Sequence, residues 1–207
     1  MEPESTSKRL LKTAERLMAE KGISATSVRE ITDAAEANVA SVNYYFGGKS
    51  ELLLQLLKNR FLQLDVELLA RVTAVEENAA GGTPEIRDLT GAYFDALAYL
   101  GFNHETGELD TFILLIQRAS AEQEAVLDRA QDYNAPGITK LINLLAISVP
   151  PERQDQLDIP TLMGLMFTAS VTAMVAMKTE KKNDVLFSAI RDFLVAGVEA
   201  YMRRFAD

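Results

Sequence analysis

The sequence of 207 residues contains no cysteine, no tryptophan and a single histidine, His104. Without cysteine the chain can form no disulfide and no thiolate metal site, and it has no cysteine nucleophile. One histidine likewise excludes a histidine-rich zinc site and most histidine-based acid–base pairs. His104 lies close to Glu105, Glu108 and Asp110, so a metal site is one interpretation and an exposed polar loop is the other. We expect the loop, and we predict no metal and no cofactor.

Proline and glycine are also scarce, at six and eleven residues, which favours long helices over many turns. No segment alternates polar and apolar residues as a half-buried strand does, and no dinucleotide-binding or Walker-type glycine loop is present. Hydrophobic residues make up 48% of the chain and charged residues 25%, which is typical of a globular protein with a substantial core.

The net charge of −9 is distributed unevenly along the chain. Through residue 60 there are nine Lys and Arg against eight Asp and Glu, and after it there are 12 against 22. An acidic protein is a poor candidate for nucleic-acid binding when only its average charge is considered. The first segment, however, is close to neutral and permits such binding. This difference predicts two parts with different partners.

Targeting signals are weak. Residues 1–7 are polar and contain no apolar run, so they do not resemble a secretory signal. Residues 159–177 contain no charged side chain, and a run of 19 is close to the ~20 that a membrane span requires. Because this run is interrupted by Pro160, Gly164 and several hydroxyl residues, we expect a buried packing helix in a cytoplasmic protein with no membrane partner.

Apolar residues recur at three- and four-residue steps through most of the chain, which predicts an all-α fold of about nine helices. The first three are short: residues 6–21, a helix opened by the capping box of Ser27 and Glu30, and a helix capped by Asn38. The expected later helices cover residues 51–77, 84–100, 108–120, 122–147 with a break at Pro136 and Gly137, 160–179 and 184–205.

Three short helices with a tight turn between the second and third are the plan of a helix-turn-helix. The third helix would enter the major groove, where the Asn43 amide can address a base edge and Val39 and Ala40 can pack on a thymine methyl. Tyrosine hydroxyls and helix N-termini suit phosphate oxygens. The candidate DNA-binding residues are therefore Thr26, Ser27, Asn38, Val39, Ala40, Ser41, Asn43, Tyr44, Tyr45 and Lys49. The alternative is that the tyrosines are half-buried packing residues and Ser27 is only a helix cap.

Residues 8–57 resemble the N-terminal domain of TetR-family transcriptional regulators, and the segments that carry the resemblance are 14–22, 25–31 and 41–53. The resemblance implies DNA contact at the positions of Ser27, Ser41, Tyr44, Tyr45 and Lys49. It also implies a DNA-binding domain at residues 1–50 and a helical effector-binding and dimerisation domain at residues 51–207. One residue departs from the pattern: the family usually has glycine where this chain has Glu36 in the turn. If that position needs a positive φ, glutamate costs about 1 kcal/mol there.

A helix-turn-helix of this size binds paired half-sites as a dimer. A ridge of small residues at four-residue steps would let a second helix approach closely. The expected dimer residues are Gly164, Thr168, Thr172 and Ala176, followed by Ile190, Phe193 and Gly197 in the last helix. The resemblance implies that these two helices form a four-helix bundle with the partner; the alternative is packing inside the monomer.

The resemblance also implies a small-molecule pocket in the middle helices. Apolar and methionine-containing linings suit a hydrophobic effector. The candidate residues are Tyr93, Phe94, Phe112, Arg118, Tyr133, Met166 and Phe167, although aromatic residues at helical spacing can equally form core.

Together these patterns predict a ligand-responsive repressor that is not an enzyme. It would bind a palindromic double-stranded DNA operator as a homodimer and would be released by an unidentified small effector. The alternative is an all-α small-molecule carrier or enzyme with a vestigial DNA-binding module. A third interpretation is DNA binding without any ligand, in which case the interior would be filled.

Overall fold

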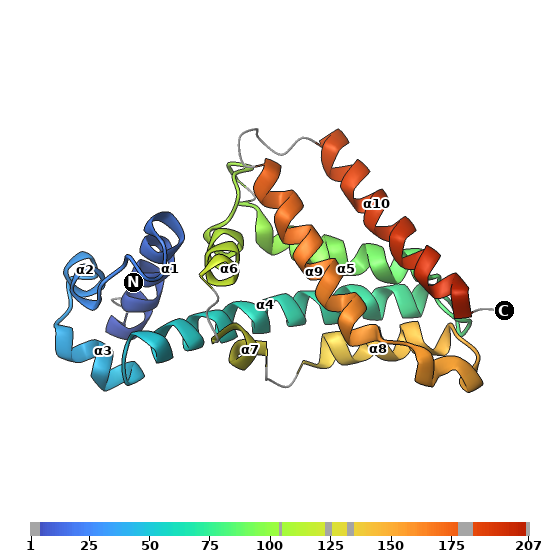
Figure 1. Cartoon of the computed structure of the whole chain (residues 1–207), viewed down its shortest axis with the longest axis horizontal. Helices are drawn as coiled ribbons and strands as arrows, with labels where there is room; N and C mark the ends of the chain where they lie inside the picture. Colours follow the sequence, from blue (N-terminus) through green and yellow to red (C-terminus); the bar gives the residue numbers. More distant parts are fainter. Residues whose placement is uncertain (1–4, 104, 123–125, 132–134, 178–183, 206–207) are drawn as a thin grey trace. The chain divides into compact units, whose positions relative to one another are not determined.

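The computed structural model describes residues 5–103, 105–122, 126–131, 135–177 and 184–205. Within these ranges the chain forms ten α-helices, two short 3-10 helices and no β-strand, which confirms the all-α prediction (Figure 1). The α-helices are α1 Thr6–Lys21, α2 Val28–Ala34, α3 Val39–Phe46, α4 Lys49–Asn78, α5 Ile86–Gly101, α6 Thr111–Ala121, α7 Val126–Gln131, α8 Pro136–Ile147, α9 Ile159–Ala176 and α10 Asp184–Met202; the 3-10 helices are η1 Pro151–Gln156 and η3 Arg203–Phe205.

The predicted helices agree with these elements to within a few residues at their ends. The helical stretch expected over residues 122–147 contains α7 and α8, and α8 begins at the predicted break, Pro136. Proline is favoured in the first turn of a helix because its missing N–H would have no partner there. Both His104 and Tyr133 lie outside the described residues. In the part of the chain that the structure describes, no helix is long and apolar enough to cross a membrane.

The chain divides into two compact units. The first unit comprises Met1–Leu62 and Asp110–Tyr133, and the second comprises Gln63–Leu109 and Asn134–Asp207. Helix α4 contributes residues to both units, and α6 and α7 belong to the first. These packing units do not follow the boundary at residue 50 that we expect between functions. The assignment of DNA binding to residues 1–50 and of effector binding and dimerisation to residues 51–207 therefore remains a prediction.

The first unit has a core of aliphatic side chains from α1 to α4, with α6 packed against α1. Leu10 and Met18 of α1, Ile31 of α2 and Val42 of α3 are all fully buried. These residues recur at the three- and four-residue steps that put one face of each helix inward. The three short helices are thus held by a shared core, which leaves their other faces exposed.

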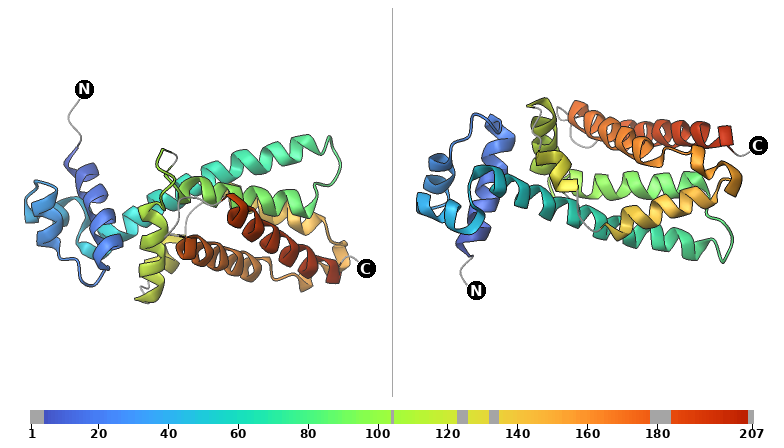
Figure 2. Two further views of the ribbon diagram at one scale, coloured as in Figure 1. Left: turned by 90° about the horizontal axis from the view of Figure 1, so that it is seen from above. Right: turned by 60° about the horizontal axis from the view of Figure 1, so that its bottom comes forward.

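The second unit is built around α5, which packs against α8, α9 and α10. Leu89, Phe94 and Leu97 of α5 are fully buried. Helices α9 and α10 lie side by side in both views of Figure 2.

A buried carboxylate marks the start of α8 within this unit. Asp65 of α4 accepts hydrogen bonds from the N–H groups of Gly137 and Ile138, at 3.0 and 2.9 Å. These are two of the N–H groups that have no partner in the first turn of a helix. A Cβ atom on Gly137 would lie 2.5 Å from the carbonyl oxygen of Asp65, so only glycine fits this close approach.

Candidate nucleic-acid interface

The start of α2 is fixed by the capping box that the sequence predicts. The Ser27 hydroxyl accepts a hydrogen bond from the N–H of Glu30 at 3.2 Å, and the Glu30 carboxylate accepts one from the N–H of Ser27 at 2.8 Å. The hydrogen bond from the Ser27 N–H, followed by that from Lys21 at 3.0 Å, lowers the pKa of Glu30 to about 2. Ser27 is therefore a helix cap, and its exposed position still permits the predicted phosphate contact.

Helix α3 presents an exposed surface that we call the α3 face: Val39, Ala40, Asn43, Tyr44 and Tyr45. Asn38 caps this helix by accepting the N–H of Ala40 at 2.9 Å. Ser41 is half-buried, Val42 is fully buried, and Phe46 is half-buried rather than a full core residue. The α3 face thus gathers most of the predicted DNA-binding side chains on one helix.

Tyr44 and Tyr45 are exposed and do not pack into the core. The Tyr44 side chain is 83% exposed and Tyr45 is 47% exposed. Their rings contact each other edge to face, with centroids 5.0 Å apart, which restrains two rigid arms that end in hydroxyls. This exposure leaves the side chains of both tyrosines accessible, which suits hydroxyl contact with phosphate oxygens.

The turn between α2 and α3 is strained at Glu36, which has a φ of +50°. The position thus adopts the left-handed conformation that glycine accepts without cost. Arg9 of α1 stabilises this turn. Its Nε donates to the carbonyl of Ala35 at 3.2 Å, and its Nη2 donates to the carbonyl of Glu36 at 3.4 Å. The sequence indicated the strain but not the part played by Arg9.

Replacing Glu36 by glycine is expected to raise the free energy of unfolding by about 1 kcal/mol, because it relieves the left-handed strain of an L-residue. Urea denaturation followed by circular dichroism measures this change. Glu36→Ala is the matched control, since it removes the carboxylate but keeps the Cβ atom and hence the strain. Equal stability of the glycine and alanine variants would contradict the strain argument.

Two predicted DNA-contact residues, Thr26 and Lys49, donate hydrogen bonds to backbone carbonyls of the loop between α1 and α2. Thr26 is 1% exposed, and its hydroxyl donates to the carbonyl of Gly22 at 2.7 Å, so its side chain does not belong to the exposed surface. Lys49 is half-buried, and its Nζ donates to the carbonyl of Ile23 at 2.5 Å. Both side chains stabilise the loop between α1 and α2. Lys49 would have to give up this bond to reach a phosphate.

The C-cap residue of α6, Glu122, makes contacts that the sequence did not predict. The Glu122 carboxylate accepts the N–H groups of Ile23 and Ser24, at 2.9 and 2.7 Å, and hydrogen bonding by Ser24 lowers the pKa of Glu122. Arg118, a predicted effector residue, is exposed and approaches the carbonyls of Ala19 and Glu20 at 3.5 Å. These partners are nearly a hundred positions away in the chain, where no local sequence signal can connect them.

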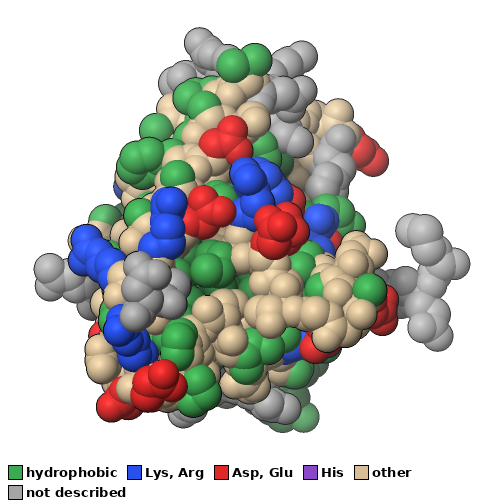
Figure 3. Space-filling view, turned by 90° about the vertical axis from the view of Figure 1, so that its right-hand side faces the viewer, with side chains coloured by type: hydrophobic (Ala, Val, Ile, Leu, Met, Phe, Trp, Pro, Cys, Tyr) green, Lys and Arg blue, Asp and Glu red, His purple; other side chains and the backbone are tan. Residues whose placement is uncertain are grey.

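Helix α3 itself contains no Lys or Arg. Figure 3 shows the side of the second unit where the turn between α4 and α5 lies, and on it basic and acidic side chains stand next to one another. DNA binding through the α3 face would therefore depend on a few placed polar contacts and not on cations of α3.

The described aromatic and methionine candidates for effector binding lie in or beside the cores of the two units, and their part in effector binding remains a prediction. Tyr93, Phe94 and Met166 are buried in its core, and Phe167 is half-buried there. Phe112 belongs to the first unit, where it is fully buried against Phe61. Helical spacing of aromatic residues indicated buried positions, but it could not distinguish a packed core from a pocket.

The predicted dimer residues form an exposed surface on α9 and α10. Gly164, Thr168, Thr172 and Ala176 are all exposed, as is Gly197, and Ile190 is half-buried. Phe193 is 77% exposed, although a phenylalanine gains most from burial. The hydroxyls of Thr168 and Thr172 donate to carbonyls one turn earlier in α9, at 2.9 and 2.8 Å, so they need no partner across an interface.

Comparisons with known proteins agree with this geometry. The family model described as "Bacterial regulatory proteins, tetR family" matches residues 10–56. The relative named "Probable HTH-type transcriptional regulator YttP", from Bacillus subtilis (strain 168), is 26% identical over 183 residues, which cover 88% of this chain and 83% of the relative.

Solved structures share the fold. A TetR family transcription regulator from Marinobacter aquaeolei VT8 has a TM-score of 0.60 at 18% identity, covering 90% of this chain and 94% of its own. A TetR transcriptional regulator from Legionella pneumophila has a TM-score of 0.59 at 17% identity, covering 94% of this chain and 97% of its own.

Proposed function

Because the chain belongs to the tetR family of bacterial regulatory proteins, and so is a DNA-binding transcriptional regulator rather than an enzyme, we propose the following function for it. It is a cytoplasmic repressor that binds a palindromic operator as a homodimer and is released by a small effector. The finer parts of this proposal concern which residues meet DNA, which surface pairs the protomers and what lowers the affinity for DNA.

The observation that carries the DNA-binding part is the α3 face. Its side chains are exposed while Val42 and Ile31 beneath them are fully buried, so the helix is held firmly and its outer surface is available. Asn43 is the amide on this face, and it can pair with an adenine edge; Val39 and Ala40 can pack on thymine methyl groups. Ser41, Tyr44 and Tyr45 would contact phosphates and so position the helix on the DNA.

The dimer part rests on the exposed surface of α9 and α10. Helix α9 has no charged residue between Ile159 and Ala176 and is apolar on every side, a composition typical of a helix that is buried all round. Nevertheless Leu165 is 65% exposed in the monomer. A second copy packed on this surface would bury Leu165, Phe193 and the small-residue ridge, and a two-fold dimer would present two α3 faces to two half-sites.

The test of DNA binding uses an operator selected from a random duplex pool, followed by fluorescence anisotropy at several salt concentrations. Tyr44→Phe removes one hydroxyl from a highly exposed side chain and is expected to weaken binding about tenfold without changing stability. Asn43→Ala is expected to relax specificity at one base pair by about 1–3 kcal/mol. Tyr99→Phe, at another exposed tyrosine, is the control and should bind as the wild type does.

The outcomes of this test are distinct. If Tyr44→Phe and Asn43→Ala both bind like the wild type, the contact assignment is wrong. If the wild type selects no sequence but binds a small molecule, the carrier alternative replaces the repressor.

The dimer surface is tested by Phe193→Asp in sedimentation velocity. A carboxylate at the centre of an apolar interface is expected to raise the dimer dissociation constant by more than about tenfold, while the monomer keeps its stability because the side chain is exposed there. Ile147→Asp, on an exposed apolar side chain of α8, is the matched control. Dimers that resist Phe193→Asp would show that another surface pairs the protomers.

A further inference from the structure

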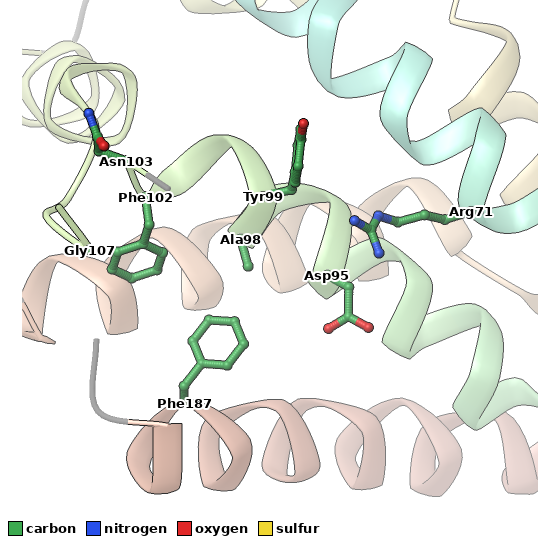
Figure 4. Close-up of a pocket in the computed structure, with 8 residues that line it drawn as sticks. All are labelled: Arg71, Asp95, Ala98, Tyr99, Phe102, Asn103, Gly107 and Phe187. Atoms are coloured by element: carbon green, nitrogen blue, oxygen red, sulfur yellow. The ribbon is translucent and has the colours of Figure 1, made fainter. Parts of the chain in front are cut away.

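The second unit contains a cavity of about 360 Å³ between α4, α5 and α10, a size suited to a small molecule (Figure 4). Arg71 comes from α4, Asp95 and Tyr99 from α5, and Phe187 from α10. A second cavity of about 640 Å³ shares Arg71 and Asp95 with the first and is also lined by Arg191. No residue that we expected to bind an effector lines either cavity.

One side of the first cavity is aromatic. Phe187 contacts Phe102 with ring centroids 6.0 Å apart, and Figure 4 shows both rings directed toward the cavity. Tyr99 of α5, three residues before Phe102, also lines the cavity and is 46% exposed. Together these side chains provide flat apolar surface that a ring or another planar group could cover.

The negative charge at this cavity is already neutralised. Asp95 accepts two hydrogen bonds from Arg191 of α10, at 3.1 and 3.3 Å. The pairing is sterically built in, because a Cβ atom on Gly91 would lie 2.3 Å from Nη2 of Arg191 and the guanidinium uses that space. A bidentate pair of this kind holds the carboxylate strongly, so Asp95 is a poor anchor for a cationic ligand.

Only part of the Arg71 guanidinium is paired with a carboxylate. Its Nε and Nη2 both contact a single oxygen of Glu67, at 2.8 and 2.7 Å. Its guanidinium carbon lies 5.8 Å from the Tyr99 ring centroid, which restrains the group beside the aromatic wall. Among the residues that the structure describes, Nη1 of Arg71 has no hydrogen-bond partner. The cavity therefore offers a donor edge that matches a carboxylate.

We propose that this cavity binds a small organic acid with an aromatic or similarly flat apolar body, its carboxylate on Arg71 and its ring against Tyr99, Phe102 and Phe187. The second cavity leaves room for a polar extension past Arg191. Since Arg191 belongs to α10, a ligand whose polar extension contacts this guanidinium would act on a helix of the proposed dimer surface. This regulatory consequence rests on the proposed function, whereas the binding itself does not.

The binding is tested by titration calorimetry of the full chain with benzoate, phenylacetate, indole-3-acetate and 1-naphthoate, each beside its neutral amide. At least one acid is expected to bind, and its amide should bind more than about tenfold more weakly because the charge-assisted pairing is lost. Arg71→Met should weaken the acid by a similar factor. Arg87→Met, at an exposed arginine of α5 that does not line either cavity, should leave the affinity unchanged.

Four results would overturn the inference: no acid binds, an amide binds as well as its acid, Arg71→Met has no effect, or 1-naphthylmethylamine binds more tightly than 1-naphthoate. Circular dichroism melting of Arg71→Met establishes that the variant is folded, and Tyr99→Ser provides an independent variant at the aromatic wall, with weaker binding expected. The selected operator is then titrated with and without the bound acid. DNA binding without acid binding would contradict only this inference. Acid binding without DNA binding would contradict only the proposed function.

Discussion

Replacing Arg60 by methionine is expected to lower the free energy of unfolding by about 4 kcal/mol, because it leaves two partly buried carboxylates without their counter-ion. Arg60 of α4 pairs with Glu15 of α1 at 3.4 Å and with Asp110, which precedes α6. The three side chains are 17–28% exposed, so water screens them poorly. The same guanidinium carbon lies 5.1 Å from the Phe112 ring centroid, and methionine keeps only the apolar part of that contact.

The matched control is Arg16→Met. Arg16 also pairs with a glutamate, Glu20, at 3.3 Å, but both side chains are about half exposed. A pair of this kind contributes less than about 1 kcal/mol. Urea denaturation measures both variants, and hydrogen exchange identifies whether the loss lies in α1, α4 and α6. Equal costs for Arg16→Met and Arg60→Met would show that the cluster does not stabilise the first unit.

The second large effect is expected for Asp65→Leu in the second unit. Leucine has the same branching and the same number of heavy side-chain atoms but accepts no hydrogen bond, so the N–H groups of Gly137 and Ile138 lose their partner. We expect a loss of about 3 kcal/mol, since each buried unpaired N–H costs about 1–3 kcal/mol and water can reach part of the α8 terminus.

Two further variants isolate the cause. Asp65→Asn keeps the shape and one acceptor oxygen, and should cost clearly less than Asp65→Leu in the same denaturation experiment. Gly137→Ala leaves the carboxylate in place but forces a Cβ atom against the α4 backbone, and it should destabilise the protein as well. A fully stable Asp65→Leu variant would mean that the α8 terminus finds other partners.

Local signals in the sequence predicted the parts of the fold that depend on neighbouring residues. The capping box of Ser27 and Glu30, the cap at Asn38 and the break at Pro136 each act within a few positions, and each occurs where expected. The strain at Glu36 was also a local prediction, since it followed from one unusual residue in a short turn.

Long-range pairings could not be predicted in this way. Nothing near Glu122 indicates that its carboxylate caps the loop after α1, and nothing near Asp65 indicates the α8 terminus. For the same reason helical spacing could not show that Tyr93, Phe94 and Met166 are buried in the core, whereas the cavity between α4, α5 and α10 is lined by the half-buried Arg71 and the exposed Tyr99. Which face of a helix meets a cavity depends on the packing of three helices, and a single chain pattern does not contain that information.

The pairing of Glu122 with Ile23 and Ser24 also has a consequence for biosynthesis. The helix-turn-helix leaves the ribosome early, but the carboxylate that caps its first loop is made about a hundred residues later, which at ~5–20 residues per second is a delay of several seconds. In a nascent chain the loop between α1 and α2 therefore lacks the Glu122 cap until α6 has emerged. For the same reason, a recombinant fragment cut after residue 62 would lack this cap. A fragment that retains the cap must also include residues 110–122.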